Sequence, residues 1–271
     1  MKRLLLIAAS AAALLMTSTA QAGPFILAGT DSEDHGSFNG SVNVNGWLYM
    51  QRALENLDGG VTTGIKKVTI LGSTSSAFSA AASAFDHSAL VGAGWTRDFV
   101  SVANFGTYFG AGGNLGTGIL MMDSGSNVLG GVGGTNFNAH ATAIDNFLGA
   151  GGALFSQANG YSWLSALISG VTFTNIGLGG DTSALAMTAA GSAAFPSLTN
   201  ANLSSGPWHG YFSNLGGFTD LADATSGANA GRAVIIGGST GSISQVPEPA
   251  SLALVGLALA GAVGAARRKR A

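Results

Sequence analysis

The chain has 271 residues, with 11 Lys and Arg against 13 Asp and Glu, and a formal net charge of −2 at pH 7. It has no cysteine, which excludes a cysteine nucleophile, a thiolate metal site and a thiol redox motif. Residues 23–246 hold twelve acidic and five basic side chains, a net charge of −7. So few cations argue against binding to nucleic acid, because Lys and Arg on phosphates supply most of that affinity.

The first 22 residues have the three parts of a secretory signal peptide. A cationic Lys-Arg pair is followed by the apolar stretch 4–16 and by an A-x-A cleavage site that ends at Ala22. We expect signal peptidase to cut after Ala22, so that the mature chain begins outside the cytoplasmic membrane. A buried core helix is the alternative, and the order of the three parts disfavours it.

The first half of the body predicts strands that alternate with helices. Residues 24–30 (PFILAGT) and 66–73 (KKVTILGS) are short apolar runs typical of buried strands. Between them, residues 45–57 favour a helix with Asn45 as its N-cap and one apolar face formed by Trp47, Met50, Leu54 and Leu57. Residues 74–95 are rich in Ala and Ser and give no clear assignment, and residues 96–109 favour a weak helix.

The next segments continue this alternation. Residues 116–126 (GTGILMMDSGS) predict a third buried strand, and residues 140–152 predict a helix with Ile144, Phe147 and Leu148 on one face. Residues 152–168 predict a strand, a sharp polar turn and a helix.

After Gly170 the pattern changes to antiparallel strands. We expect 171–178 to pair with 183–191, and 218–223 and 232–238 to form two more strands. The whole pattern implies an α/β domain whose parallel sheet is covered on both faces, with extra antiparallel strands in the C-terminal half. The 43 glycines leave a glycine-rich solenoid as an alternative, but they show no fixed period.

The order of these elements resembles the class I glutamine amidotransferase-like group, which includes ThuA-like proteins. The features that match are the loop before the first long helix, DSGS at 123–126, the FSQANGY turn at 155–161 and GPWHGYF at 206–212. The resemblance implies a three-layer, flavodoxin-like parallel sheet. It also places Ala158 where that group has its cysteine nucleophile, and alanine cannot attack an acyl group. The turn is then either a scaffold or a display of Gln157 and Asn159 as hydrogen-bonding groups.

Polar side chains follow each predicted parallel strand. Ligands bind at the carboxyl ends of such strands, so we expect one cleft there, and no cofactor. Its candidate binding residues are Asp31, Asp34, His35, Ser73, Asp123, Ser124, Gln157 and Asn159, joined by His209 from the C-terminal half.

Metal binding stays open. DSEDHG (31–36) departs from the calcium-loop pattern at His35, so a solvated acidic loop is favoured there, and DSGSN (123–127) matches an adhesion motif only loosely. His209 beside Trp208 fits packing or capping as well as a place in the cleft.

The last segment has three parts. A linker at 241–249 ends in Pro247-Glu248-Pro249, residues 250–266 are uncharged, and a cationic run follows, formed by Arg267, Arg268, Lys269 and Arg270. As a helix the apolar part spans about 25 Å, which is nearly the ~30 Å of a hydrocarbon core. The cations would stay on the cytoplasmic side. A transmembrane sorting segment over 250–271 is therefore expected.

This tail resembles the PEP-CTERM sorting signal of Gram-negative bacteria. The resemblance implies cutting near Pro-Glu-Pro by an exosortase, a membrane protease-transpeptidase, and an association with exopolysaccharide and biofilm matrix. A plain membrane anchor is the alternative.

The sequence therefore predicts one exported α/β domain over 23–240, anchored transiently in the inner membrane and then moved to the cell surface or extracellular matrix. We expect it to be non-catalytic, with carbohydrate as the candidate ligand. The alternative is a ThuA-like or hydrolase-like enzyme that acts on sugars in the strand-end cleft through Asp31, His35, Asp123 or His209.

Overall fold

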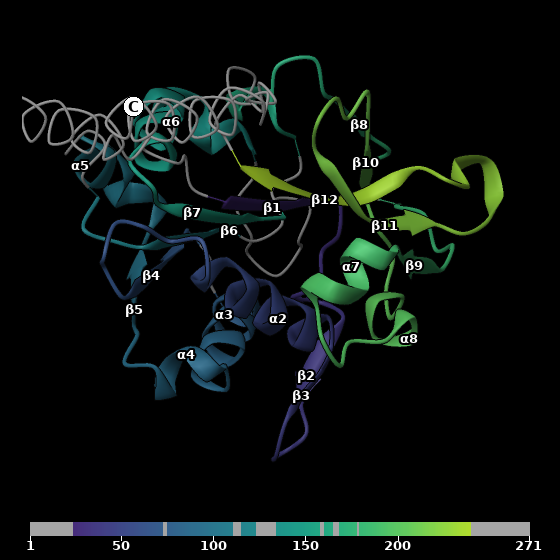
Figure 1. Cartoon of the computed structure of the whole chain (residues 1–271), viewed down its shortest axis with the longest axis horizontal. Helices are drawn as coiled ribbons and strands as arrows, with labels where there is room; N and C mark the ends of the chain where they lie inside the picture. The colour runs from purple at the N-terminus through teal and green to yellow at the C-terminus, as the bar shows by residue number, and fades with distance from the viewer. Residues whose placement is uncertain are drawn as a thin grey trace, which may run out of the picture. The chain divides into compact units, whose positions relative to one another are not determined.

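The computed structural model describes residues 24–72, 75–110, 115–122, 134–157, 160–164, 168–177 and 179–239. Its central feature is one large sheet with helices on both faces (Figure 1). The predicted α/β class is confirmed. The predicted signal peptide and tail lie outside the described residues.

Parallel strands form one half of the sheet. Their spatial order is β5-β4-β6-β7-β1, and every neighbouring pair runs parallel. The strands are β1 (Pro24–Ala28), β4 (Lys67–Leu71), β5 (Thr96–Val100), β6 (Ile119–Met122) and β7 (Ala153–Ser156). The apolar residues of β1, β4, β6 and β7 are almost fully buried, as expected for strands covered on both faces, whereas β5 at the sheet edge is mostly exposed.

Antiparallel strands form the other half and come from the end of the body. β12 pairs with β1, followed in space by β10 and β8, while β11 pairs with β12 and β9. These strands are β8 (Thr172–Asn175), β9 (Leu185–Met187), β10 (Gly210–Ser213), β11 (Thr219–Ala224) and β12 (Ala233–Ser239). The predicted antiparallel C-terminal half is confirmed.

Helices cover both faces of the sheet (Figure 1). One face carries α2 (Gly46–Asp58), α3 (Ser75–Asp86), α4 (Ala89–Gly92), α7 (Ala189–Ala194) and α8 (Asn200–Leu203). The other carries α5 (Phe105–Phe109) and α6 (Ala141–Gly149). A separate hairpin joins β2 (Gly36–Phe38) to β3 (Asn43–Asn45), and the 3-10 helices are η1 (Val102–Asn104), η2 (Gly134–His140), η3 (Ser162–Leu164) and η4 (Gly227–Asn229).

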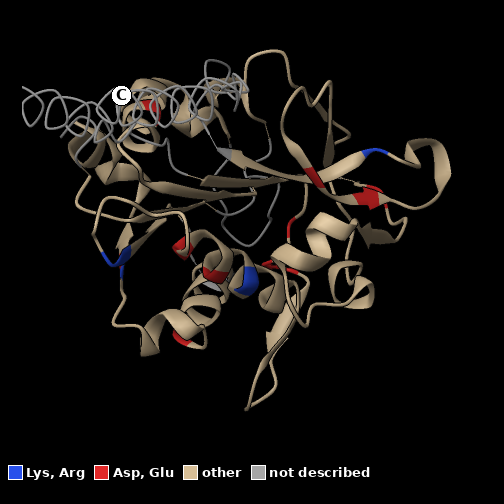
Figure 2. Ribbon diagram, in the orientation of Figure 1, with Lys and Arg blue, Asp and Glu red and all other residues tan. Residues whose placement is uncertain are grey.

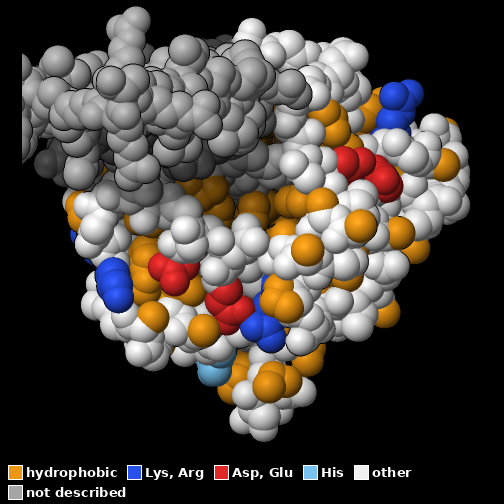
Figure 3. Space-filling view, viewed as in Figure 1, with side chains coloured by type: hydrophobic (Ala, Val, Ile, Leu, Met, Phe, Trp, Pro, Cys, Tyr) orange, Lys and Arg blue, Asp and Glu red, His pale blue; other side chains and the backbone are white. Residues whose placement is uncertain are grey.

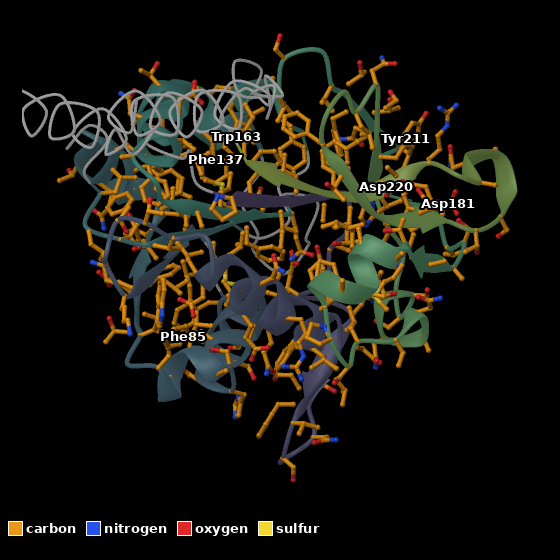
Figure 4. The ribbon with its side chains drawn as sticks, in the orientation of Figure 1. Phe85, Phe137, Trp163, Asp181, Tyr211 and Asp220 are labelled. Atoms are coloured by element: carbon orange, nitrogen blue, oxygen red, sulfur yellow. The ribbon has the colours of Figure 1, made fainter. Side chains whose placement is uncertain are left out.

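Each face of the sheet has its own hydrophobic core, because successive side chains of a strand point to opposite faces. In β1, Ile26 packs under α2 and α3, whereas Phe25 and Leu27 belong to the core on the α6 side. Phe137 and Trp163 lie beside each other in that second core, and Phe85 lies on the opposite face (Figure 4). Burial of each such side chain contributes about 1.5–3 kcal/mol.

The first strand of the chain takes an unexpected place. Counted from β4, the order β5-β4-β6-β7-β1 is the flavodoxin-like order 2-1-3-4-5, with β1 in the fifth position. The connectivity nevertheless differs from that fold, because β1 lies between β7 and β12 rather than beside β4, so the predicted flavodoxin-like fold is not confirmed.

Three local predictions are wrong. Residues 96–100 form the edge strand β5 instead of the start of a helix, and only 102–109 are helical. β8 and β9 do not pair with each other, since β8 pairs with β10 and β9 with β11. Asn45 makes no side-chain cap to α2; it has a φ of 58°, and its side-chain oxygen accepts a hydrogen bond from Asn202.

Candidate functional site

The polar loop after β1 lies directly against the start of β10. Gly29 allows this approach, since a Cβ there would lie 1.8 Å from the carbonyl oxygen of Gly210. The His209 amide donates to the Gly29 carbonyl at 2.6 Å, and Thr30 forms a bridge with Trp208. The backbone thereby brings the loop at 30–35 beside His209, from the other end of the body.

Asp31 and His209 form a buried pair across this junction. The Asp31 and His209 side chains are 7% and 6% exposed, and His209 Nε2 lies 2.9 Å from Asp31 Oδ2. The other ring nitrogen, Nδ1, lies 2.9 Å from the carbonyl oxygen of Gly177. A carbonyl oxygen and a carboxylate oxygen can each only accept a hydrogen bond. If Asp31 is ionised, both ring nitrogens of His209 must therefore donate, which requires a protonated ring.

The electrostatics favour that protonated form. The hydrogen bond with Asp31 raises the pKa of His209 above its ordinary value of 6.5, and burial of the ring opposes it. The Gly177 carbonyl and the charges of Asp31 and Glu33 also raise the pKa. The two contacts and the raised pKa therefore both favour the protonated ring.

His35 completes this group from the exposed side. Its Nε2 lies 3.4 Å from Asp31 Oδ2, and its carbonyl accepts a hydrogen bond from Ser205 at 2.6 Å. A Cβ on Gly206 would lie 2.0 Å from the His35 ring, so only glycine leaves room for the imidazole there. Asp34, in the same loop, is half-buried.

Gln157 organises the same loop from the end of β7. Its Oε1 accepts from Thr30 Oγ1 at 2.7 Å and from the Ser32 amide at 3.0 Å, and its Nε2 donates to Glu33 Oε2 at 3.0 Å. All four residues are at most 6% exposed. The amide therefore fixes the β1 loop to the β7 end from inside the protein.

Tyr161 joins the two strand ends a second time. Its hydroxyl donates to one of two nearby carbonyl oxygens, that of Ala28 at 2.9 Å or that of Ser156 at 2.8 Å, and accepts from the Ala28 amide at 3.3 Å. Burial raises the pKa of this hydroxyl far above its ordinary value. Tyr161 is thus a neutral structural link below the loop.

Four of the predicted site residues therefore come together at one place: Asp31, His35 and His209 in one group, with Gln157 on the other side of the same loop. Ser73, Asp123, Ser124 and Asn159 lie outside the described residues, as do Ala158 and all the predicted processing residues. Thr30, Ser32, Glu33 and Tyr161 also belong to this site but were not among its predicted binding residues. Ser32 and Glu33 lie in the DSEDHG loop, and Thr30 and Tyr161 lie at the ends of the predicted first strand and of the FSQANGY turn.

The loop is not the solvated acidic loop that the sequence favoured. Asp31 and Glu33 are 5% and 2% exposed. The loop lies against the start of β10, so that Asp31 contacts His209, while Glu33 accepts from Gln157. The hollow beside Asp31 and His35 leaves only about 10 Å³ for water-sized molecules. That is about the space that one water needs. In the described part of the chain, no group of three or more His, Cys, Asp or Glu side chains could hold a metal ion.

Charged residues are sparse along the rest of the described ribbon (Figure 2). Within the described ranges, no helix is both long and apolar enough to cross a bilayer.

The fold and site define an α/β domain whose candidate site residues are joined in a buried network. Outside that domain, residues 245–270 match the model of the PEP-CTERM protein-sorting motif. The predicted sorting signal is confirmed: the chain is an exported protein that is recognised by an exosortase and passes through a membrane-anchored sorting step at its C-terminal segment. Neither the curated proteins nor the solved structures contain a match to the chain.

Proposed function

We propose that the protein is a non-catalytic component of the cell surface or extracellular matrix. Signal peptidase removes residues 1–22, and residues 23–240 fold outside the inner membrane as one domain. The segment 250–271 holds the chain in the inner membrane until the linker 241–249 is cut. The matched motif supports this route, since it contains both the Pro-Glu-Pro and the cationic end.

The observation that carries the non-catalytic role is the internal use of the site's polar groups. A histidine that acts as a general base needs one unprotonated nitrogen within reach of a substrate. Both nitrogens of His209 instead point at Asp31 and the Gly177 carbonyl, and Gln157 is bonded on both its oxygen and its nitrogen. These contacts support a structural role for groups that the enzyme alternative needs for chemistry.

The hollow beside the pair supports the same choice. With room for about one water next to Asp31 and His35, a sugar cannot reach the carboxylate without movement of the surrounding loop. The amidotransferase-like resemblance then concerns the scaffold, in keeping with Ala158 at the nucleophile position.

Exopolysaccharide is the proposed partner in the matrix. The body has a net charge of −7 from 23 to 246, and the face in Figure 3 is dominated by uncharged side chains. An acidic polymer would be repelled by such a body, so a neutral polysaccharide fits it better.

The proposed route is tested by changing Pro247, Glu248 and Pro249 to alanine. These changes leave the apolar span 250–266 and the cationic end intact, so membrane insertion should persist. The rigid, extended segment before the span is lost. An antibody against the body should then detect a full-length form in the membrane fraction. Wild type should be shortened and recovered with the surface or matrix fraction.

A matched triple-alanine variant at Ser242, Ile243 and Ser244 serves as the control, because it changes the same linker outside the matched motif. It should be processed like wild type. Equal shortening and release of the Pro-Glu-Pro variant would mean that the tail is only an anchor. Wild-type body found solely in the membrane would overturn the surface or matrix role.

A further inference from the structure

Two Asn-Gly pairs lie at opposite ends of the hairpin formed by β2 and β3, which projects from the described body (Figure 1). Asn39-Gly40 lies in the turn, and Asn45-Gly46 lies where β3 passes into α2. A third pair begins at Asn159, outside the described residues. In such a pair the glycine nitrogen can attack the side-chain amide carbon of asparagine, because glycine has no side chain to hinder the approach. Since the pairs share one covalent chemistry, the fold decides which of them reacts.

The turn leaves the nucleophilic nitrogen of the first pair accessible. Asn39 and Gly40 are exposed, and a Cβ built on Gly40 would have no atom beyond its chain neighbours within 4 Å. Gly40 has a φ of 89°, a conformation that favours glycine. Among the residues that the structure describes, none accepts a hydrogen bond from the Gly40 amide. Attack by this nitrogen therefore breaks no contact of the fold.

The same turn activates the amide carbon of Asn39. Its Oδ1 accepts hydrogen bonds from the backbone amides of Ser41 at 3.2 Å and Val42 at 3.1 Å. Attack on the carbon gives this oxygen a negative charge, and N–H donors already aimed at such an oxygen stabilise the charge as it develops. The Asn39 amide also donates to the Val42 carbonyl at 3.2 Å, which closes the turn. The two donors are thus in place before the reaction begins.

The second pair is blocked by its surroundings. The Gly46 amide donates to the His35 carbonyl at 3.0 Å. Gly46 is also buried, and a Cβ there would lie 2.1 Å from the carbonyl oxygen of Ser32. The side-chain oxygen of Asn45 accepts from Asn202 at 3.3 Å. Attack by the Gly46 nitrogen would therefore break its hydrogen bond and displace the first residue of α2.

We propose that Asn39 is a modification site, at which spontaneous deamidation gives aspartate and isoaspartate in the folded body. The Gly40 nitrogen loses its proton to solvent and bonds to the Asn39 amide carbon; the bond from that carbon to Nδ2 breaks, and Nδ2 takes up a proton and leaves as ammonia. Water then opens the cyclic imide at either carbonyl. The product carries a new negative charge beside the exposed side chains of Phe38 and Val42. This reaction needs no enzyme or cofactor and is independent of the proposed matrix role.

The test is peptide mapping by mass spectrometry after incubation of the full-length chain in detergent at pH 8, in water labelled with heavy oxygen. Asn39 should gain one solvent oxygen and give isoaspartate, which electron-transfer fragmentation distinguishes from aspartate. Asn45 should convert at least about tenfold more slowly, because the Gly46 hydrogen bond and burial raise the barrier. Absence of isoaspartate at Asn39, or equal conversion of the two residues, overturns the proposal.

Incubation in urea separates the effect of the fold from that of the local sequence. Both glycine nitrogens are free in the unfolded chain, so Asn39 and Asn45 should then convert at similar rates. If the difference between them stays as large in urea as in the folded chain, the fold does not select Asn39 and the proposal fails.

Gly40→Ala places a methyl group beside the attacking nitrogen and should slow conversion of Asn39 several-fold. Gly64→Ala is the matched control, because Gly64 is also exposed, has a φ of 73° and has open space for a Cβ. It should leave the rate at Asn39 unchanged. Equal rates in wild type and Gly40→Ala would contradict attack by the Gly40 nitrogen.

Discussion

At the residue scale, His209 connects parts of the body that are far apart in sequence. Its ring joins Asp31, which follows the first strand, to the Gly177 carbonyl near the end of β8, although Asp31 and His209 are 178 positions apart in sequence. The Asp31–His209 pair therefore links two parts of the body that are distant in sequence.

His209→Gln should lower the free energy of unfolding by about 2 kcal/mol at pH 6, because hydrogen bonds to charged groups are lost and Asp31 stays buried. Since the folded pKa of His209 is raised above 6.5, its contribution is complete below pH 6.5 and is lost as the pH rises through the folded value. Urea unfolding from pH 5 to 9 measures this. The variant should lack that decline, and His87→Gln, at an exposed histidine, should keep it.

Asp220 gives a second titration. A β-bulge in β11 disturbs the register between Asp220 and Asp223, which lets two carboxyl groups three positions apart meet on one side. Burial, followed by the hydrogen bond and charge of Asp223, raises the pKa of Asp220 to about 7.

A raised carboxyl pKa means that the folded state gains stability from the proton below about pH 4 and loses it as the pH rises toward 7. Asp220→Asn should remove this loss and raise the free energy of unfolding at pH 8 by about 1 kcal/mol, a small gain because solvent screens a partly exposed carboxylate. Thermal unfolding at pH 4 and 8 measures it. Asp98→Asn, at a carboxylate 59% exposed on β5, is the control and should not share the gain.

At the scale of elements, burial of one helix face explains how α2 is held. Met50, Leu54 and Leu57 are fully buried against the sheet and the neighbouring helices, as their spacing predicted. Trp47, on the same predicted face, is half-buried, and its ring nitrogen donates to the Glu33 carbonyl at 2.8 Å. The helix thereby also supports the loop that holds the candidate site.

Leu54→Ala should cost about 3 kcal/mol, because it removes buried methyl groups and leaves a cavity under the helix. Leu48→Ala on the same helix should cost about 1 kcal/mol, since Leu48 is only partly buried. Urea unfolding of both variants measures the difference. Equal costs would contradict the assignment of the buried face.

The sequence predicted the buried strands because a continuous apolar run, such as residues 24–28 or 119–122, can be recognised from the local sequence alone. β5 was missed because TRDFV lies at the sheet edge, where Thr96, Arg97 and Asp98 are exposed and the apolar signal is weak. Asp31, His35 and Gln157 could be predicted from the ends of the parallel strands, and His209 from a glycine-flanked loop of the C-terminal half. Their pairing depends on β10 lying beside the β1 loop, which no local pattern reveals.

At the scale of the whole molecule, the sorting tail and the α/β body differ in what their function requires. The tail is identified by a short ordered motif at 245–270, which needs no tertiary structure. The candidate site of the body, in contrast, exists only when β10 lies beside the loop after β1.

The position of β1 sets the timing of folding during export. The first strand to emerge lies between β7 and β12, and Pro24 pairs with Ser239 at the far end of the body. A chain that crosses the membrane from its N-terminus cannot close this sheet until its last strand has also crossed. Contacts of such long sequence separation form slowly. The pairing of β1 with β12 can therefore form only after nearly the whole body has crossed, shortly before or after the sorting segment reaches the membrane.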